Sequence, residues 1–109
     1  MVKGIPSLRL VLIRHGESFN NTLSAISYEH YSKHRVADPE LTPDGHKQAH
    51  HVASFLKDPG NTVFPRISKL YTSPMTRALQ TSQPIGHFLK INPEVKFFIF
   101  NQLSCLRTP

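Results

Sequence analysis

Arginine and histidine side chains follow two apolar runs of the chain, and together they could handle a phosphate group. Arg14 and His15 come directly after the run 8–13, and Arg77 lies a helical turn beyond the run 67–72. Guanidinium groups pair with phosphate oxygens in a bidentate geometry. A neutral imidazole beside them could attack phosphorus and carry the phosphoryl group as a covalent intermediate. These residue types therefore predict a phosphate site whose chemistry requires no metal.

Three strands and two helices must position these side chains. The runs 8–13, 67–72 and 95–100 have the length and the β-branched or aromatic content of strands. Strands that alternate with helices are typical of an α/β fold with parallel pairing and right-handed crossovers. Ligands of such folds collect at the carboxyl ends of the strands. We therefore expect Arg14 and Arg77 to converge at one edge of a sheet.

Start and stop signals delimit the two helices. Thr42 is the expected N-cap of the first helix, and turn-forming residues at 58–61 end it. Its apolar positions recur with the helical period: Ala49, Val52, Ala53 and Leu56. The second helix begins at 73–74, and Pro84 ends or kinks it, with a last turn to Leu89. We expect this helix to turn three side chains inward: Met75, Ala78 and Leu79.

The turn after the first run has two features that favour an anion. Gly16 lets the backbone turn tightly there. A helix that begins at Glu17 or Ser18 would direct its free N–H groups at the same spot, where they attract negative charge.

The length and the single cysteine limit what the chain can be. Its 109 residues suffice for one domain or part of one. Cys105 stands alone, which excludes an intramolecular disulfide framework and a multi-cysteine zinc site. No run approaches the roughly 18 apolar residues of a membrane helix, and the first residues lack a signal-peptide pattern. We expect a soluble, cytoplasmic protein without a membrane partner.

The positive charge of the chain does not follow a nucleic-acid pattern. The 13 lysines and arginines against 7 acids give a formal net charge of +6, but no long basic run occurs. The aromatic residues do not alternate with bases as they do on a stacking platform. An anionic small substrate accounts for the same charge, and we expect no nucleic-acid partner.

Three ordered blocks of sequence resemble one known family. Residues 14–18 with Asn21 resemble the R-H-G-E-S-x-x-N signature of the histidine phosphatase superfamily, in its phosphoglycerate mutase-like branch. Residues 38–49 resemble its D-x-x-L-T-x-x-G-x-x-Q-A segment, and residues 71–81 its Y-S-S-P-x-x-R-A-x-Q-T segment. The resemblance implies a three-layer α/β/α fold with a mostly parallel sheet, of which residues 1–109 are the N-terminal part of a single domain.

The resemblance also implies a role for each matching residue. His15 matches the phosphorylated nucleophile, Arg14 and Arg77 match the arginines that hold the transferring group, and Asn21 matches a polar residue at the pocket edge. Paired arginines suit phosphoryl transfer because the reaction depends on positioning and on neutralising the phosphate oxygens. The resemblance implies a phosphatase or phosphomutase without a cofactor or metal. Its substrate would be a small phosphorylated molecule or a phosphoprotein.

The chain departs from the family pattern after the third run. Family members carry a second catalytic histidine in a later segment, and usually a glutamate proton donor, but no acid follows Glu94 here. Cys105 stands near the expected glutamate, and a thiol is mostly protonated near neutral pH. We therefore expect a truncated family member. Two functions stay open: phosphoryl transfer through His15, or an incompetent remnant that only binds anions or partners through Arg14 and Arg77.

The third run also bears on association. Residues 97–100 would form an apolar edge strand with little covering it, which is an aggregation-prone arrangement. We therefore expect the chain to be marginally stable or to self-associate.

Two groups of histidines each have a functional and a structural interpretation. One group has a spacing close to that of metal ligands, but no nearby Cys, Asp or Glu completes a set: His46, His50 and His51. A solvated helix face explains it better than a metal site. His30 and His34 lie in the segment 28–35, which is either a lid over the pocket or an exposed polar segment.

Overall fold

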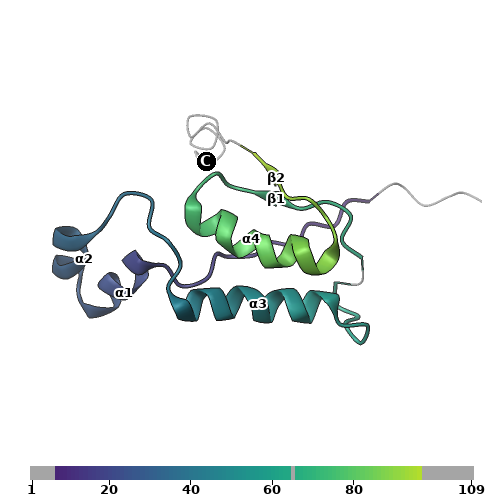
Figure 1. Cartoon of the computed structure of the whole chain (residues 1–109), viewed down its shortest axis with the longest axis horizontal. Helices are drawn as coiled ribbons and strands as arrows, with labels where there is room; N and C mark the ends of the chain where they lie inside the picture. Colours follow the sequence, from purple (N-terminus) through teal and green to yellow (C-terminus); the bar gives the residue numbers. More distant parts are fainter. Residues whose placement is uncertain (1–6, 65, 97–109) are drawn as a thin grey trace, which may run out of the picture.

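The described part of the chain consists of four helices and two short strands. The computed structural model describes residues 7–64 and 66–96. The elements are α1 (Phe19–Ile26), α2 (Tyr28–His34), α3 (Pro43–Lys57), β1 (Tyr71–Thr72), α4 (Thr76–Leu89) and β2 (Glu94–Val95). Figure 1 shows α3 and α4 side by side, with α1 and α2 together at one end of the molecule. These residues form an α/β arrangement, and its third layer stays a prediction.

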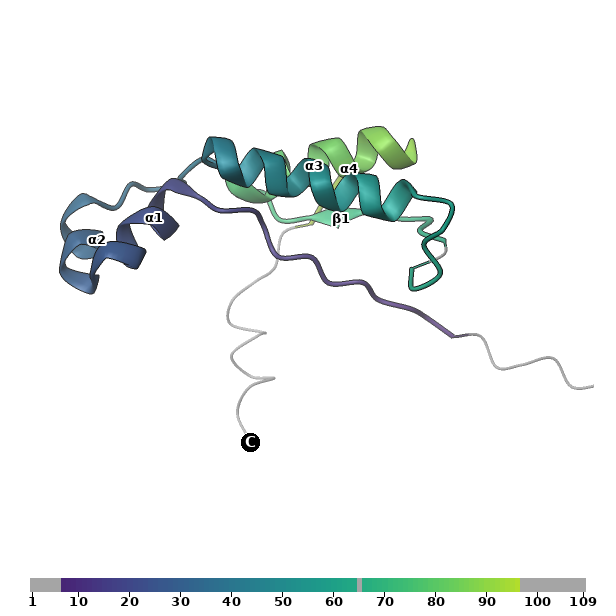
Figure 2. The same cartoon turned by 90° about the horizontal axis from the view of Figure 1, so that it is seen from below.

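The two strands form a parallel sheet, as the sequence predicts. Tyr71 pairs with Glu94 and Thr72 with Val95, and the N–H of Glu94 donates to the carbonyl of Leu70 at 2.8 Å. The chain passes from β1 to β2 through α4, which contacts both β1 and α3. Figure 2 shows both helices on the same side of β1. The first of these strands is shorter than predicted, since 67–70 lie outside β1. The predicted strand 95–100 lies mostly outside the described residues, and of its described part only Val95 belongs to β2.

The predicted strand at 8–13 is wrong. These residues belong to no strand, and three of their side chains are largely exposed: Leu8 (82%), Leu10 (74%) and Leu12 (92%). A strand needs a hydrogen-bonded neighbour as well as the right composition, and the described sheet contains only β1 and β2. Figure 2 shows the segment leaving the body of the molecule. Exposed apolar side chains of this kind are compatible with self-association, which stays a prediction.

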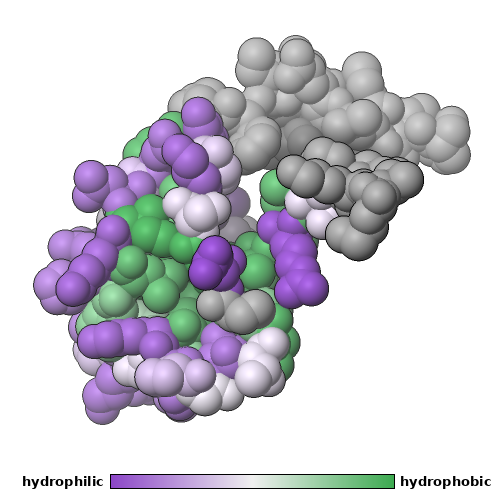
Figure 3. Space-filling model, turned by 90° about the vertical axis from the view of Figure 1, so that its right-hand side faces the viewer, coloured by the Kyte–Doolittle hydropathy of each residue, from purple (hydrophilic) through white to green (hydrophobic). Residues whose placement is uncertain are grey.

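Helix α3 confirms the expected start and stop signals. The Thr42 hydroxyl accepts from the N–H of Gly45 at 3.0 Å, Pro43 occupies the first position, and Asp58 is the C-cap. The core lies where α3 meets α4, and its buried members are Ala53, Leu56 and Ile85. Apolar surface nevertheless remains on the side of the molecule that Figure 3 presents. The predicted apolar face of α3 is correct, with Val52 half-buried at its margin.

Helix α4 begins later than predicted and continues past its proline. It starts at Thr76 rather than 73–74, runs through Pro84 to Leu89, and ends on Lys90 in the left-handed conformation (φ 58°). Met75 (42% exposed) and Leu79 (38%) do not turn inward as predicted. The buried face is instead made by small polar and apolar side chains: Thr81, Ser82, Pro84 and Ile85. The spacing of apolar residues predicted the wrong buried face, because two of the buried residues, Thr81 and Ser82, carry hydroxyl groups.

No helix within residues 7–64 and 66–96 is both long enough and apolar enough to cross a membrane.

Candidate functional site

A cavity of about 290 Å³ lies between three parts of the chain: the segment 14–17, here called the His15 turn, the carboxyl end of β1, and α4. Arg14 and His15 line it from the turn, and Thr72 and Ser73 line it from the carboxyl end of β1. Helix α4 contributes further polar groups from Thr81 and Ser82, together with apolar side chains. No lining residue is an aspartate or glutamate. The structure therefore brings Arg14 and His15 to the strand end where the sequence predicts a site.

The His15 ring has a defined hydrogen bond to its own turn. Its Nδ1 lies 2.7 Å from the carbonyl oxygen of Gly16, and the residue is half-buried. Because a carbonyl oxygen can only accept, Nδ1 must carry the proton of this bond. In the neutral ring Nε2 then has a free lone pair. Any chemistry of the ring as a base or nucleophile would therefore use that atom.

Close backbone packing fixes the turn that carries Arg14 and His15. A Cβ atom on Gly16 would overlap the carbonyl oxygen of Gly45, and a Cβ atom on Gly45 would overlap that of Glu17. Neither glycine has a positive φ. The expectation that Gly16 serves a tight turn is therefore corrected, since this glycine is needed for the close approach to α3. The Gln48 side chain adds a tether by accepting from the N–H of Glu17 at 2.8 Å.

A single hydroxyl group links this turn to the start of α4. The Oγ1 atom of Thr81 accepts from the N–H of Gly16 at 3.1 Å and donates to the carbonyl of Arg77 at 2.8 Å. Thr81 is 5% exposed, so its hydrogen bonds are shielded from water. Arg77 is half-buried and is not among the lining residues of the cavity. The structure therefore holds the backbone of Arg77 beside the His15 turn.

The amino end of α1 uses its polar groups internally. Ser18 is the N-cap and forms a capping box with Asn21, whose Oδ1 accepts from the Ser18 N–H at 2.9 Å. The N–H of Phe19 donates to the carbonyl of Glu40 at 2.9 Å. These N–H groups are therefore not free for an anion, contrary to the expectation for this helix. Asn21 does not line the cavity and instead holds the cap of α1.

Asp38 contacts Thr76, the first residue of α4, and the sequence pattern predicts no role for it. It has a positive φ of 60°, and its Oδ1 accepts from the backbone N–H of Thr76 at 2.8 Å. Its Oδ2 accepts from the Thr76 hydroxyl at 2.5 Å. These hydrogen bonds hold the pKa of Asp38 below its ordinary value, with a smaller contribution from the charge of Arg77. The signal that could have identified Asp38 in the sequence is its position at the start of the block 38–49, ahead of Leu41 and Thr42.

The lowered pKa of Asp38 predicts how its contribution to stability depends on pH. The carboxylate stabilises the folded state fully above the ordinary value of 3.8, and this contribution is lost as the pH falls through the lower folded-state pKa. We expect the urea midpoint of the wild-type chain to fall more steeply than that of Asp38→Asn below about pH 4. If the urea midpoints of the two proteins fell by the same amount as the pH is lowered from about 5, the result would contradict the capping role of Asp38.

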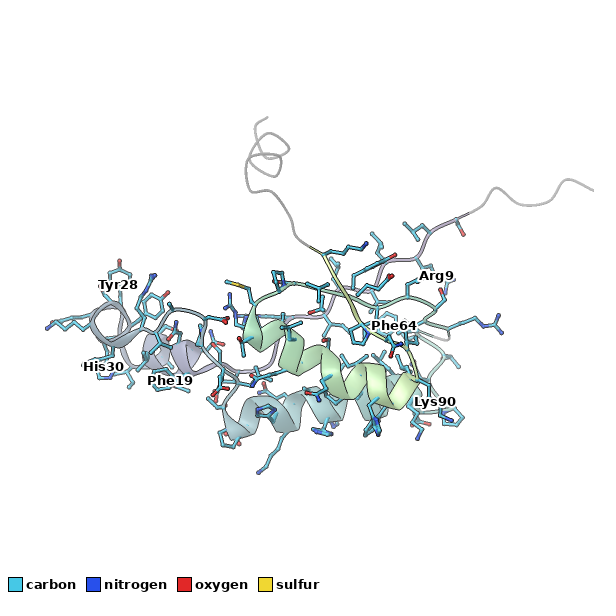
Figure 4. All side chains as sticks on the ribbon, turned by 45° about the horizontal axis from the view of Figure 1, so that its top comes forward. Arg9, Phe19, Tyr28, His30, Phe64 and Lys90 are labelled. Atoms are coloured by element: carbon cyan, nitrogen blue, oxygen red, sulfur yellow. The ribbon has the colours of Figure 1, made fainter. Side chains whose placement is uncertain are left out.

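Helix α2 lies away from the cavity. None of its residues is buried, and none lines the cavity. Figure 4 shows Tyr28 and His30 at the end of the molecule opposite Lys90. The His30 and His34 rings lie against each other, with centroids 4.6 Å apart. The segment 28–35 thus matches the exposed polar interpretation rather than a lid over this cavity.

The remaining histidines lie on helices α3 and α4. His50 packs edge-on against Phe88, with ring centroids 6.0 Å apart. In the part of the chain that the structure describes, no group of three His, Cys, Asp or Glu side chains could hold a metal ion. A larger cavity of about 570 Å³, lined by Lys57, His87 and Lys90 among others, lies at the carboxyl end of α4. It contains none of the predicted site residues.

Comparison with known proteins gives a family match for most of the chain. The sequence profile described as histidine phosphatase superfamily (branch 1) matches residues 10–97. The matched range includes the cavity-lining pair Arg14 and His15, as well as Asn21 and Arg77. No curated protein and no solved structure shows a significant match to the chain.

Proposed function

The chain belongs to the histidine phosphatase superfamily, and from this membership we propose that it transfers a phosphoryl group through a phosphohistidine at His15. The observation that carries the proposal is the hydrogen bond between Nδ1 of His15 and the Gly16 carbonyl. In the neutral ring this bond leaves the lone pair on Nε2, which is the atom that would attack. His15 also lines a cavity beside Arg14, at the carboxyl end of β1.

The proposed reaction proceeds in two balanced steps. The Nε2 lone pair of His15 attacks phosphorus, an N–P bond forms, and the ester P–O bond breaks as the leaving oxygen takes a proton from water. A water molecule then attacks the phosphohistidine, the N–P bond breaks, and inorganic phosphate leaves as the neutral ring is restored. The proton released by the attacking water neutralises the hydroxide left by the first step. Transfer to a hydroxyl group in place of water would make the reaction that of a mutase. Arg14 and Arg77 would neutralise the phosphate oxygens during both transfers.

The cavity supports a compact phosphorylated substrate. Its volume of about 290 Å³ is small for a ligand site. Ile13, Leu70 and Ile85 add apolar walls beside the polar groups. We propose a small phosphorylated molecule, or a phosphorylated side chain of a protein, as the substrate class. Family membership also supports a three-layer α/β/α arrangement of the phosphoglycerate mutase-like type.

One observation favours a second candidate function. No carboxyl group lines the cavity in the described part of the chain, so the leaving oxygen has no acid there to protonate it. A chain with this site could bind phosphate groups through Arg14 and Arg77 without catalysing their transfer. Binding without covalent labelling would identify this second function.

Covalent labelling tests the proposed reaction directly. The 109-residue chain is incubated with acetyl phosphate or phosphoramidate and analysed by intact mass spectrometry at neutral and at acidic pH. We expect the mass to increase by one phosphoryl group, and the adduct to disappear in acid, because a phosphohistidine is acid-labile. An adduct that survives acid would point to a hydroxyl or another acceptor. Phosphate binding without any adduct would contradict phosphoryl transfer and favour the second function.

A further inference from the structure

The segment 38–42, here called the brace, ties the His15 turn to the start of α4. At one end the Thr42 N–H donates to the carbonyl of Glu17 at 2.9 Å, and Leu41 forms a β-bridge with Ser18. On the α4 side the N–H of Leu41 donates to the side-chain oxygen of Gln80 at 2.8 Å. The brace therefore contacts both elements that carry the proposed phosphate-binding groups.

Asp38, the first residue of the brace, caps α4 although it lies 38 residues before Thr76 in the sequence. The N-cap residue Met75 makes no side-chain hydrogen bond to the helix. Asp38 supplies one in its place, by accepting from both the N–H and the hydroxyl of Thr76. A cap of this kind satisfies a donor that the first turn otherwise leaves without a partner. Asp38 reaches it with a backbone φ of 60°, a conformation unusual for a residue other than glycine.

Arg77 is the residue that this cap holds in place. It follows Thr76 directly, and its own carbonyl is bonded to Thr81, which also binds Gly16. The first turn of α4 is thus fixed on one side by Asp38 and on the other by the His15 turn. An uncapped first turn frays, and a frayed turn would carry the Arg77 guanidinium away from a phosphate group at His15.

We propose that Asp38 is a positioning residue for Arg77, holding the first turn of α4 so that the guanidinium reaches the phosphoryl group bound at His15. The inference rests on the proposed function, since it concerns the same phosphate group. It adds a residue that does not line the cavity and acts only through Thr76 and Arg77.

Substitutions of Asp38 can affect phosphate binding in two opposite ways, through the lost negative charge and through the lost helix cap. The carboxylate repels an anion, so removing its charge alone would tighten phosphate binding. Removing the cap would weaken binding, because Arg77 would lose its orientation. Asp38→Asn removes the charge and keeps an amide oxygen that can accept from Thr76. Asp38→Gly removes both charge and cap, while glycine adopts the φ of 60° without strain.

The test is a titration of the 109-residue chain with inorganic phosphate, followed by NMR at the Arg77 Nε–H signal. We expect Asp38→Gly to weaken phosphate binding by about fivefold or more, the scale of a lost helix cap. We expect Asp38→Asn to bind as tightly as the wild type or more tightly. The matched control is Glu29→Gln, which removes an exposed acid paired with Lys33 on α2 and should change nothing.

The outcomes separate this inference from the proposed function. Arg77→Ala lacks the Nε–H signal and is followed at the backbone N–H of Gly16 instead; it should abolish the phosphate response. If Arg77→Ala binds phosphate like the wild type, the proposed role of Arg77 fails and the inference fails with it. If Arg77→Ala weakens binding and Asp38→Gly does not, the inference alone is overturned. Should Asp38→Gly lose its helical circular dichroism, Thr76→Pro decides instead, since proline suits the first helical position and removes both groups that donate to Asp38. An Arg77 signal unchanged in folded Thr76→Pro, with wild-type phosphate affinity, overturns the role of Asp38.

Discussion

We expect His15→Asn to abolish the acid-labile phosphoryl adduct that the proposed reaction forms on the chain. The asparagine amide is comparable in size to part of the imidazole ring but offers no nucleophilic nitrogen, so no N–P bond can form. Intact mass spectrometry after incubation with acetyl phosphate or phosphoramidate should therefore show the unmodified mass alone. We expect the loss to be complete rather than partial, because the proposed reaction has no second route through this cavity.

Two controls distinguish the loss of the nucleophile from disruption of the phosphate-binding site. His51→Asn changes an exposed histidine on α3 that does not line the cavity, and it should retain the adduct. His15→Asn should still bind inorganic phosphate, because Arg14 and Arg77 remain. If the His15→Asn chain is labelled like the wild type, the nucleophile is another residue. Loss of both labelling and phosphate binding would show that the substitution had disrupted the turn.

Local signals explain why helix α3 could be predicted from the sequence. The start of α3 is encoded by adjacent residues: Thr42 accepts from Gly45, and Pro43 fits the first position. The apolar face of α3 was also correct, because it packs along its length against α4. The apolar run 8–13 contains no information about a partner strand, and in the described structure it has none. Pairing is a property of the whole sheet rather than of one run.

The site could be predicted only as far as residue types and strand ends allow. Arg14 and His15 lie where an α/β arrangement places ligands, at the carboxyl end of β1. The support around them depends on contacts between distant residues, such as Thr81 with Gly16 and Asp38 with Thr76. Thr81 and Asp38 carry no chemistry of their own that would single them out in a sequence. Their roles follow from packing, which sequence reasoning about individual segments does not supply.

Gly45→Ala should destabilise the fold strongly, although alanine is the better helix former. Gly45 lies in the first turn of α3, where an added Cβ atom would overlap the carbonyl oxygen of Glu17. That oxygen belongs to the backbone and cannot move aside by changing rotamer. The gain in helix propensity is about 1 kcal/mol. Forcing an extra atom into a packed contact costs about 1–3 kcal/mol or more, and the upper end applies here because the added Cβ would lie well within 3.0 Å of a backbone oxygen. We expect a net loss that lowers the melting temperature by roughly 5–15 °C.

The same substitution should also weaken phosphate binding, because Glu17 is the last residue of the His15 turn, which carries Arg14 and His15. To relieve the overlap, this turn must move away from α3 and break the hydrogen bond from the Glu17 N–H to Gln48. Gly60→Ala is the matched control: its Cβ would lie 3.4 Å from the Asp58 side chain, an ordinary contact. With no positive φ at Gly60, this control should keep or slightly raise the melting temperature. Equal melting temperatures for Gly45→Ala and Gly60→Ala would show that close packing against α3 does not hold the His15 turn in place.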